Sequence, residues 1–323
     1  MSAKRKPRAI YLVLPEVQLL DLSGVAYAFA RAGLYGQPYE VVFCSSEEEV
    51  DTIGGLKLSN FVNYASIDIQ KSDTLFIPGF EGKAILSNEF RKRSRALYNW
   101  LRDAAQSGAL VCSVCSGSYL LAQAGLLDGR ECATHWTCVD HLQRRFPNLK
   151  VVKNRLFVRS SENIYTSAGV TSGIDLALHI LSRRHGAKLA FQVARRLVVY
   201  YRRNGADEQE SIYLKYRNHV DDTIHKVQDW LVQHLDQSAT IEDLAEYANA
   251  SPRSLIRNFK KRTGLTIGQY VAELRLELAQ TLLRDTGCKV DHVAAECGFS
   301  SARQLRNLFR KKLGVSPRKA VAA

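Results

Sequence analysis

The chain has 323 residues, about twice the length of a typical domain, so two domains are expected. Hydrophobic residues make up 46% of the chain and charged residues 24%. No run approaches the roughly 18 consecutive apolar residues of a membrane span. The seven cysteines are scattered and do not fit a disulfide framework. The net charge of +13 favours a polyanionic partner.

The N-terminus begins with a short basic segment and a brief apolar run, MSAKRKPRAIYLVLPEV. The run is too short for the core of a signal peptide, and no small-residue cleavage site follows it. Scattered cysteines without a framework are typical of reduced thiols in a cytosol. We therefore expect a basic tail, a first strand, and a cytoplasmic protein that does not enter a membrane.

Short apolar runs alternate with segments of helical period through the first 200 residues. Continuous apolar strands alternating with helices indicate a parallel sheet covered on both faces. Residues 8–200 are therefore predicted to form an α/β domain, a flavodoxin-like doubly wound parallel sheet. The expected strands are 8–14, 39–44, 74–78, 109–114 and 163–167, and the expected helices are 19–33, 88–106 and the helix that Gly169 opens.

The segment SVCSG places Cys115 between small residues, where an apolar strand meets a helix. Small neighbours allow the strained turn of a nucleophile elbow, and the helix that follows would lower the pKa of the thiol. The Ser116 N–H group and a second donor at Gly79 would then form an oxyanion hole. Three interpretations stay open: a small residue filling a tight turn, a ligand contact, and a catalyst.

Other cysteine chemistry is not favoured. Cys112, Cys115, Cys132, His135 and Cys138 have spacings that resemble zinc ligands, but Cys112 belongs to a buried strand, whereas a structural zinc site needs its cysteines on a tight turn. A disulfide between Cys112 and Cys115 is also disfavoured, because residues three apart across a strand end rarely reach its geometry. No metal and no cofactor is expected.

The first domain resembles the class I glutamine amidotransferase-like superfamily, in the PfpI-like branch that includes isonitrile hydratase and many sensor domains of regulators. The match rests on VQLLDLSG, IPGFEG, VCSGSYLLAQAGLLDG, ATHW and TSAGVTSGIDLALHIL. The resemblance implies an acidic residue, Asp21, that approaches the cysteine, with His135 nearby. The residues it implies as ligand-binding are Asp21, Gly79, Cys115, Ser116, His135, Gly169 and Val170.

Three positions depart from that family pattern. Peptidase members have a histidine directly after the cysteine, and this chain has Ser116, so the cysteine–histidine dyad is missing. Val25 replaces a usual proline, and Phe80 replaces the second glycine of a Pro-Gly-Gly loop, where its ring would narrow the pocket.

The polar segment YYRRNGADEQES ends the alternating pattern, and a linker is predicted over residues 201–219. Beyond it, residues 220–323 show helical period throughout and predict a separate all-α domain. Within this domain, residues 241–264 resemble residues 290–314, so the sequence contains an internal repeat.

Each copy of the repeat predicts a helix-turn-helix unit. In the first copy, Thr240 and Asp243 form a capping box, and Ser251 caps a second helix that has Pro252 at its first position. In the second copy, Ser300 or Ser301 caps the equivalent helix. Residues 265–286 are expected to form a helix that joins the two units.

The second helix of each copy carries cations and no acidic residue on its outer faces. A helix in the major groove needs polar side chains near its N-terminus and cations around them for phosphate. A solvated basic face is the alternative for one isolated helix, but two copies with matched turns and caps favour DNA binding. The cations are Arg253, Arg257, Lys260, Lys261 and Arg262 in the first copy and Arg303, Arg306, Arg310, Lys311 and Lys312 in the second.

This region resembles the AraC-type DNA-binding domain over about 100 residues, on the segments LAEYANASPRSLIRNFKKRTG, RLELAQTLL and VAAECGFSSARQLRNLFRKKLGVSP. The resemblance implies two recognition helices in successive major-groove segments on one face of double-stranded DNA. Only the last few residues depart, where Arg-Lys-Ala replaces the usual Tyr-Arg. The residues expected at DNA are Arg253, Ile256, Arg257 and Lys260 in the first helix, and Arg303, Arg306, Asn307 and Lys311 in the second.

Together the two domains have the architecture of GlxA-type transcriptional regulators, and we expect a regulator whose α/β domain senses a small molecule. The alternative is a hydratase- or amidase-type enzyme that uses Cys115 and carries a DNA-binding appendage. The absence of the dyad favours a sensor without catalysis. Expected partners are a promoter operator, a small-molecule effector, RNA polymerase and a second copy of the chain, bound through the α/β domain.

Overall fold

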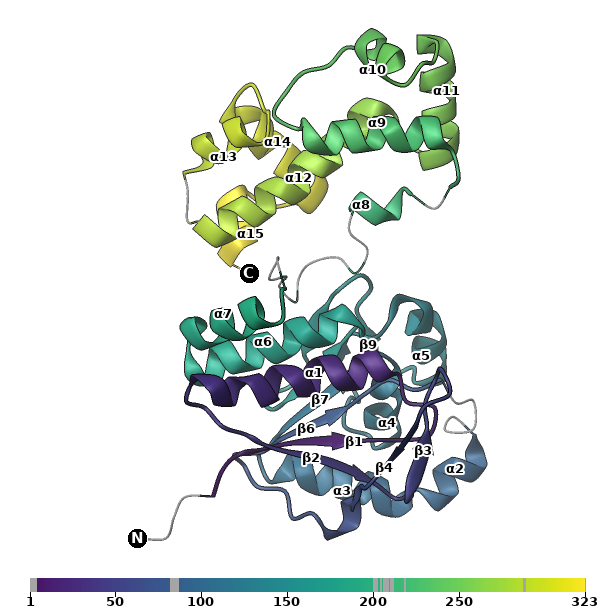
Figure 1. Cartoon of the computed structure of the whole chain (residues 1–323), viewed down its shortest axis with the longest axis vertical. Coiled ribbons are helices and arrows are strands. Elements are labelled where there is room, and N and C mark those ends of the chain that lie inside the picture. The colour runs from purple at the N-terminus through teal and green to yellow at the C-terminus, as the bar shows by residue number, and fades with distance from the viewer. Residues whose placement is uncertain are drawn as a thin grey trace. The chain divides into compact units, whose positions relative to one another are not determined.

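The computed structural model describes residues 5–81, 87–199, 203, 205, 209, 212–217, 219–286 and 289–322. The chain divides into two compact units, residues 1–209 and 210–323 (Figure 1). None of the described helices combines the length and the apolar character that crossing a lipid bilayer requires.

The first unit is built on a seven-stranded sheet in the order β10-β11-β7-β6-β1-β2-β5. All pairs are parallel except β10 with β11, so the predicted α/β class is confirmed with one antiparallel strand at an edge. The strands are β1 (Arg8–Leu12), β2 (Glu40–Ser45), β5 (Val62–Asn63), β6 (Thr74–Ile77), β7 (Leu110–Val114), β10 (Phe157–Arg159) and β11 (Ile164–Ser167).

All five strands expected from apolar runs are present. The additional strands have only two or three residues and lack a continuous apolar run. They include two small pairs outside the main sheet: an antiparallel hairpin of β3 (Glu49–Asp51) with β4 (Lys57–Ser59), and β8 (Glu131–Cys132) beside β9 (Lys150–Val151).

Helices cover both faces of the sheet and give the unit two cores (Figure 1). The helices α1 (Leu19–Ala32), α6 (Thr171–His185) and α7 (Ala187–Arg196) pack together on one face. The other core contains residues of α3 (Arg95–Gln106), α4 (Ser118–Gln123) and α5 (Val139–Arg145).

One predicted helix is interrupted. The segment 88–106 forms α2 (Asn88–Arg93) and α3, separated at Ser94, whose ψ of 16° is not helical. Serine competes with helical geometry because its hydroxyl bonds to nearby groups, and here the Ser94 hydroxyl pairs with the Tyr98 side chain.

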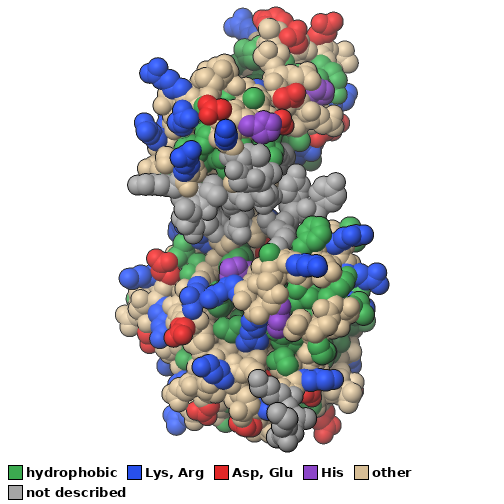
Figure 2. All heavy atoms as spheres, turned by 90° about the vertical axis from the view of Figure 1, so that its left-hand side faces the viewer, with side chains coloured by type: hydrophobic (Ala, Val, Ile, Leu, Met, Phe, Trp, Pro, Cys, Tyr) green, Lys and Arg blue, Asp and Glu red, His purple; other side chains and the backbone are tan. Residues whose placement is uncertain are grey.

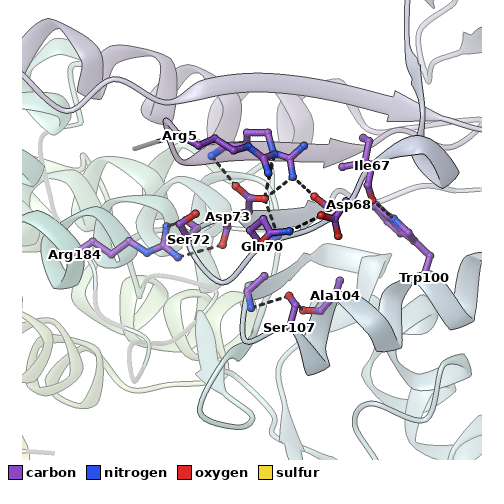
Figure 3. A network of polar contacts seen from close by, with 12 residues as sticks. Arg5, Ile67, Asp68, Gln70, Ser72, Asp73, Trp100, Ala104, Ser107 and Arg184 are labelled. Atoms are coloured by element: carbon purple, nitrogen blue, oxygen red, sulfur yellow. Dashed lines mark hydrogen bonds and ion pairs between the residues drawn. The ribbon is translucent and has the colours of Figure 1, made fainter. Parts of the chain in front are cut away.

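A buried carboxylate connects the beginnings of β1 and β6. Asp73, fully buried, accepts hydrogen bonds from the Arg8 backbone N–H (3.0 Å), from the Arg8 guanidinium (2.6 and 3.1 Å) and from the Gln70 N–H (3.0 Å). Arg184, on α6, donates to the Asp73 carbonyl at 3.2 Å. Figure 3 shows Arg5, Gln70 and Arg184 converging on Asp73 from three parts of the chain.

The second unit is all-α, and its helices form two small cores that share α12 (Ile267–Thr286), the joining helix expected from the sequence. The first core contains residues of α9 (Asp222–Gln233), α10 (Ile241–Tyr247) and α11 (Pro252–Thr263). The second contains residues of α13 (Val290–Glu296) and α14 (Ala302–Leu313). Two short helices complete the unit, α8 (Ile212–Lys215) and α15 (Pro317–Ala322).

The boundary between the two units, after residue 209, lies inside the predicted linker 201–219. Much of that segment lies outside the described residues. Of the described ones, Arg203, Gly205 and Gln209 form hydrogen bonds within the first unit, and Ile212–Lys215 is helical. The domain limits 8–200, 201–219 and 220–323 stay predictions.

Candidate functional site

Four neighbouring strands, β11, β7, β6 and β1, end at one edge of the sheet, and five of the predicted site residues lie just beyond them. Asp21 follows β1, Gly79 follows β6, Cys115 follows β7, and Gly169 and Val170 follow β11. Ligands of open α/β sheets bind in the crevice at the carboxyl ends of the strands. The structure brings these five residues together, and ligand binding by them stays a prediction.

Cys115 occupies a strained elbow, as its small neighbours predict. Its φ is 55°, an unusual value for a residue with a side chain, and its side chain is only 3% exposed. The chain packs so closely that a Cβ atom on Gly117 would lie 2.1 Å from the Ile77 carbonyl oxygen. On Gly169, whose φ is +95°, a Cβ atom would lie 2.3 Å from the Cys115 Cβ. Glycine is therefore required at both positions.

Asp21 connects the loops that follow β6 and β11. Its fully buried carboxylate accepts hydrogen bonds from the Gly79 N–H at 3.2 Å and from the Val170 N–H. Val170 is itself strained, with φ 51°, which is costly for a β-branched residue. Burial raises the pKa of Asp21, although the two backbone donors and the Cys115 thiol oppose that shift.

The prediction that the helix lowers the pKa of Cys115 is wrong. Burial of the thiol, followed by the charge of Asp21 and of Cys138, raises its pKa well above the ordinary value, and only the Ser116 N–H opposes them. The helix behind the elbow is short, a 3₁₀ turn (Cys115–Gly117) and then the six residues of α4, and a short helix offers little dipole to compensate burial. The protonated thiol is therefore the favoured form.

The two N–H groups predicted to form an oxyanion hole, those of Gly79 and Ser116, both already have hydrogen-bond acceptors. The Gly79 N–H donates to Asp21, and the Ser116 N–H points at the Cys115 sulfur. The Ser116 hydroxyl is engaged as well: it donates to the Phe80 carbonyl at 2.6 Å and accepts from the Phe80 N–H at 2.8 Å. Ser116 thus fixes the loop after β6 against the elbow.

A cleft of about 490 Å³ opens beside the elbow. Of the predicted ligand-binding residues, Cys115, Ser116 and His135 line it, whereas Asp21, Gly79, Gly169 and Val170 lie behind the sulfur. Burial lowers the pKa of His135, so its ring is neutral at pH 7, and its Nδ1 lies 2.7 Å from the Thr137 hydroxyl. The other lining residues are Gln18, Phe80, Glu81, Tyr119, Thr137, Cys138 and His141.

The sequence reasoning missed one pair in this lining. The Tyr119 hydroxyl lies 2.7 Å from His141 Nδ1, and burial raises the pKa of Tyr119. Tyr119 could have been found, because it follows Cys115 by four residues and so faces the same side of the helix after the elbow. His141 lies on the short helix α5, which no long periodic segment announces.

Two polar side chains of α6, Asp175 and His179, have structural roles. Asp175 binds Arg203 through a 2.7 Å ion pair, and His179 packs its ring against Phe157 and Tyr165. Among the described residues, no three His, Cys, Asp or Glu side chains are placed to hold a metal ion.

The second unit contains both predicted helix-turn-helix motifs, α10–α11 and α13–α14. The Thr240–Asp243 capping box is formed, and Ser251 and Ser301 each cap the second helix of their motif by accepting the N–H three residues later. Each second helix ends at a glycine with positive φ, Gly264 or Gly314. The second helices of the two motifs thus share a serine cap and a C-terminal glycine, so the repeat in the sequence is also a repeat in the structure.

Each second helix buries one face and exposes the other. The buried residues are Leu255 and Phe259 in α11 and Leu305 and Phe309 in α14. Seen from the side where α13 and α14 lie, the second unit presents a group of Lys and Arg side chains (Figure 2). All predicted DNA-contacting residues are exposed: Arg253, Ile256, Arg257, Lys260, Arg303, Arg306, Asn307 and Lys311.

One cation near the C-terminal end of each helix is paired within the unit. Arg262 pairs with Asp221 at 3.3 Å, and Lys312 pairs with Glu273. Within the described chain, Arg253 and Arg303 at the N-terminal ends have no carboxylate within ion-pair distance. These two guanidinium groups are therefore available to a partner outside the chain.

Two family models match the chain. The model described as the DJ-1/PfpI family matches residues 7–183, and one described as a helix-turn-helix domain matches residues 244–322. The first region contains the Cys115 cleft, and the second contains both α11 and α14.

Among related proteins, the chain is 33% identical over 314 residues to the HTH-type transcriptional regulator ArgR of Pseudomonas aeruginosa, covering 95% of this chain and 91% of that protein. It is 32% identical over 229 residues to GbdR, another HTH-type regulator of that species, covering 71% of this chain and 62% of GbdR. The chain thus spans somewhat less than two thirds of GbdR.

Among solved structures, Drosophila melanogaster DJ-1beta superposes with a TM-score of 0.52 at 20% identity, covering 61% of this chain and all of that one. This likeness concerns the fold of the first unit alone. It agrees with the α/β fold described for this unit.

Proposed function

Because this chain belongs to the DJ-1/PfpI family and carries a helix-turn-helix domain behind that region, we propose that it is a sequence-specific DNA-binding transcription regulator. Its first unit senses a small metabolite, and its second unit binds double-stranded DNA at a promoter operator. Its place of action is then the cytoplasm, where the chromosome is accessible.

The observation that carries the proposal is the pair of matched recognition helices. Both α11 and α14 are capped by serine, end at a glycine and present an exposed arginine, Arg253 or Arg303, in the first turn. Arginine near the N-terminus of a groove-entering helix is suited to paired hydrogen bonds with guanine. The helix α12 between the motifs has 20 residues and is about 30 Å long, close to the roughly 34 Å repeat of DNA.

The test is selection of bound sequences from a random double-stranded DNA library with the full chain. A regulator of this construction enriches one site with two unlike elements about one helical turn apart. A chain that binds all sequences equally, at any salt concentration, would contradict the proposal.

The Cys115 cleft supports the sensor role. It is concave and contains aromatic rings, a neutral His135, a thiol and the carboxylate of Glu81, and such a mixture suits a small polar ligand. Glu81, which lines the cleft, favours a ligand that is cationic or donates hydrogen bonds. Thermal unfolding against a panel of nitrogen-containing metabolites would identify it, since a ligand that binds only the folded chain raises the melting temperature.

An enzyme of hydratase or amidase type that uses Cys115 is the second candidate. The strained elbow favours it, because such strain is common at active sites. The raised pKa of the thiol and the engaged N–H donors of Gly79 and Ser116 favour the sensor. Incubating the chain with its identified effector and following the effector by mass spectrometry separates the two, because turnover that disappears in Cys115→Ala would establish the enzyme.

Two further partners belong to the proposal. An operator-bound regulator meets RNA polymerase at the promoter, and a repeated site is bound most tightly by two copies of the chain. We assign the contact between copies to the first unit, as the sequence predicts, since the second unit is occupied with DNA.

A further inference from the structure

Three residues just before the second unit are attached to the first unit near the Cys115 elbow. These are Arg203, Gly205 and Gln209, the described residues between 200 and 211, and they are called the connector here. Gln209 is the last residue of the first unit, and the second unit begins at the next residue. Along the chain, the connector therefore lies directly before the second unit.

Gln209 is fastened to the segment that carries His135. Its side-chain amide donates to the Thr134 carbonyl at 2.9 Å and to the Arg155 carbonyl at 3.1 Å, and its N–H donates to the Asn154 side chain at 3.0 Å. Thr134 directly precedes His135, which lines the cleft.

Thr134 also holds the elbow. Its side chain is fully buried, and its hydroxyl donates to the Cys115 carbonyl at 3.0 Å. The Ser118 hydroxyl donates to the same Thr134 oxygen at 2.9 Å. Thr134 thus contacts the elbow through its hydroxyl and the connector through its carbonyl. A displacement of Thr134 would therefore disturb its hydrogen bonds to both.

Gly205 and Arg203 are held near Gly169 and Val170, which lie behind the Cys115 sulfur. The Gly205 carbonyl accepts from the Leu156 N–H at 3.1 Å, and the Leu156 carbonyl accepts from the Ala168 N–H at 2.7 Å, just before Gly169. Arg203 donates to the Thr171 hydroxyl at 2.6 Å and pairs with the buried Asp175 at 2.7 Å. Thr171 follows Val170, whose N–H holds Asp21.

Gly205 shows that this contact is closely packed. A Cβ atom at this position would lie 2.4 Å from the Phe157 carbonyl oxygen, so no larger residue fits without moving the chain. All three attachments are made by specific side chains or by a required glycine. Thr134 contacts Cys115 directly, whereas Ala168 and Thr171 are the chain neighbours of Gly169 and Val170.

We propose that the connector is the mechanical link of the regulator: a ligand in the Cys115 cleft displaces the segment Thr134–Cys138 and thereby loosens the hold on Gln209. This inference rests on the proposed function, because it assumes that the second unit binds DNA and that the cleft takes a ligand. The Thr134–Gln209 hydrogen bond is its central element.

The test uses the full chain with monobromobimane as the occupant of the cleft. Cys138 lines the cleft and is the half-buried thiol among the described cysteines, the others being buried. Cys288, which lies outside the described residues, is replaced by Ser so that labelling is confined to Cys138, where the sulfur displaces bromide. A second occupant, Thr137→Trp, repeats the experiment without chemical labelling.

Two quantities are measured: deuterium exchange of the peptide containing residues 203–209, and the dissociation constant for the DNA site obtained by selection. Filling the cleft is expected to speed exchange in the connector and to change the dissociation constant by at least about fivefold, a common size for coupling between sites. Gln209→Met, which keeps the side-chain length and removes the amide, is expected to abolish the DNA effect of filling the cleft.

The matched control is Asn163→Leu. The Asn163 amide donates to two carbonyls, those of Ala105 (2.7 Å) and Ala109 (2.9 Å), as Gln209 does, but at the opposite end of β11 from the cleft. This variant is expected to keep the full response to cleft filling. A response that persists unchanged in Gln209→Met, or that is absent from the parent chain, overturns the link while DNA binding itself stands. Failure to select any DNA site overturns the proposed function instead.

Discussion

Two acidic groups, the Asp21 carboxyl and the Cys115 thiol, lie together beneath the cleft, and burial raises the pKa of both. Both groups therefore release a proton less readily than they would in water. A protonated thiol can donate a hydrogen bond to the Asp21 carboxylate, which two backbone N–H groups also stabilise. Cys115 is thus part of a hydrogen-bond network, which supports the proposed sensor role.

Alkylation measures this directly. Because the thiolate is the reactive form, we expect iodoacetamide to modify Cys115 in the native chain at pH 8 at least about tenfold more slowly than in the urea-unfolded chain. Asp21→Asn should speed the reaction, since it removes a charge that raises the pKa of the thiol. Mass spectrometry of the Cys115 peptide follows both rates, and rapid native labelling would favour the enzyme.

The raised pKa of Asp21 also predicts a pH dependence. In the range between its ordinary value and the raised folded value, the folded state binds more protons than the unfolded state, so Asp21 contributes stability at low pH that is lost as pH rises. We therefore expect the destabilisation caused by Asp21→Asn to be larger at pH 4.5 than at pH 7.5. Urea unfolding of both proteins checks this, and a difference that grows with pH would contradict it.

At the scale of elements, the recognition helices α11 and α14 combine the same construction with different exposed residues. Arg253 and Arg303 occupy equivalent positions, but Ile256 corresponds to Arg306, and Arg257 corresponds to Asn307. An isoleucine suits the methyl group of thymine, whereas asparagine suits adenine and arginine suits guanine. The two helices are therefore expected to read different base sequences.

Substitutions should separate base contacts from phosphate contacts. Arg253→Ala and Arg303→Ala should each cost about 1–3 kcal/mol at the selected site and relax its sequence preference. Lys260→Ala and Lys311→Ala should weaken binding to all sequences and reduce the slope of affinity against salt by about one. Mobility-shift titrations at several salt concentrations distinguish these effects, and an unchanged affinity of Arg253→Ala would show that α11 does not read the site.

The Asp73 network joins elements far apart in the sequence, and its loss should be expensive. Asp73→Ala leaves the Arg8 guanidinium, which is largely buried, without its partner, and breaking a buried pair on one side costs about 3–5 kcal/mol. Thermal unfolding of the first unit should show a lowered melting temperature. Lys153→Ala, which removes an exposed ion pair with Asp140, is the control and should have almost no effect.

The sequence predicts elements well where one physical pattern dominates. The five long apolar strands and the capped helices α10, α11 and α14 follow from periodicity and from capping residues. Strand β10 has no such pattern, because pairing with β11 decides its conformation. The direction of the Cys115 pKa shift was also out of reach, because a helix N-terminus can be read from sequence whereas the burial that outweighs it depends on the whole fold.

At the scale of the whole molecule, one surface of the first unit suggests how two copies meet. Leu20 and Tyr27 on α1 and Leu34 just after it are 50%, 43% and 60% exposed, and their spacing of seven residues places them along one side of the helix. Exposed apolar side chains that form a row are typical of contact surfaces.

We expect residues 1–209 to form a homodimer at tens of micromolar. Replacing both Leu20 and Tyr27 by Glu should yield monomers, because charges cannot be buried in an apolar contact without a partner. Leu56→Glu, at an equally exposed leucine of the β3–β4 turn, should leave the dimer intact. Light scattering gives the mass, and a monomeric parent fragment would exclude this unit as the dimer contact.

In the proposed regulator, the unlike residues of α11 and α14 would give each chain a polarity on DNA. A protein with two identical recognition helices would bind equally well in either direction, whereas the proposed regulator would recognise a site with two different halves. Reversing such a site in place, with its base composition unchanged, would reverse the direction in which the proposed regulator binds along the chromosome. The orientation of the operator would then decide toward which neighbouring gene the bound chain is directed.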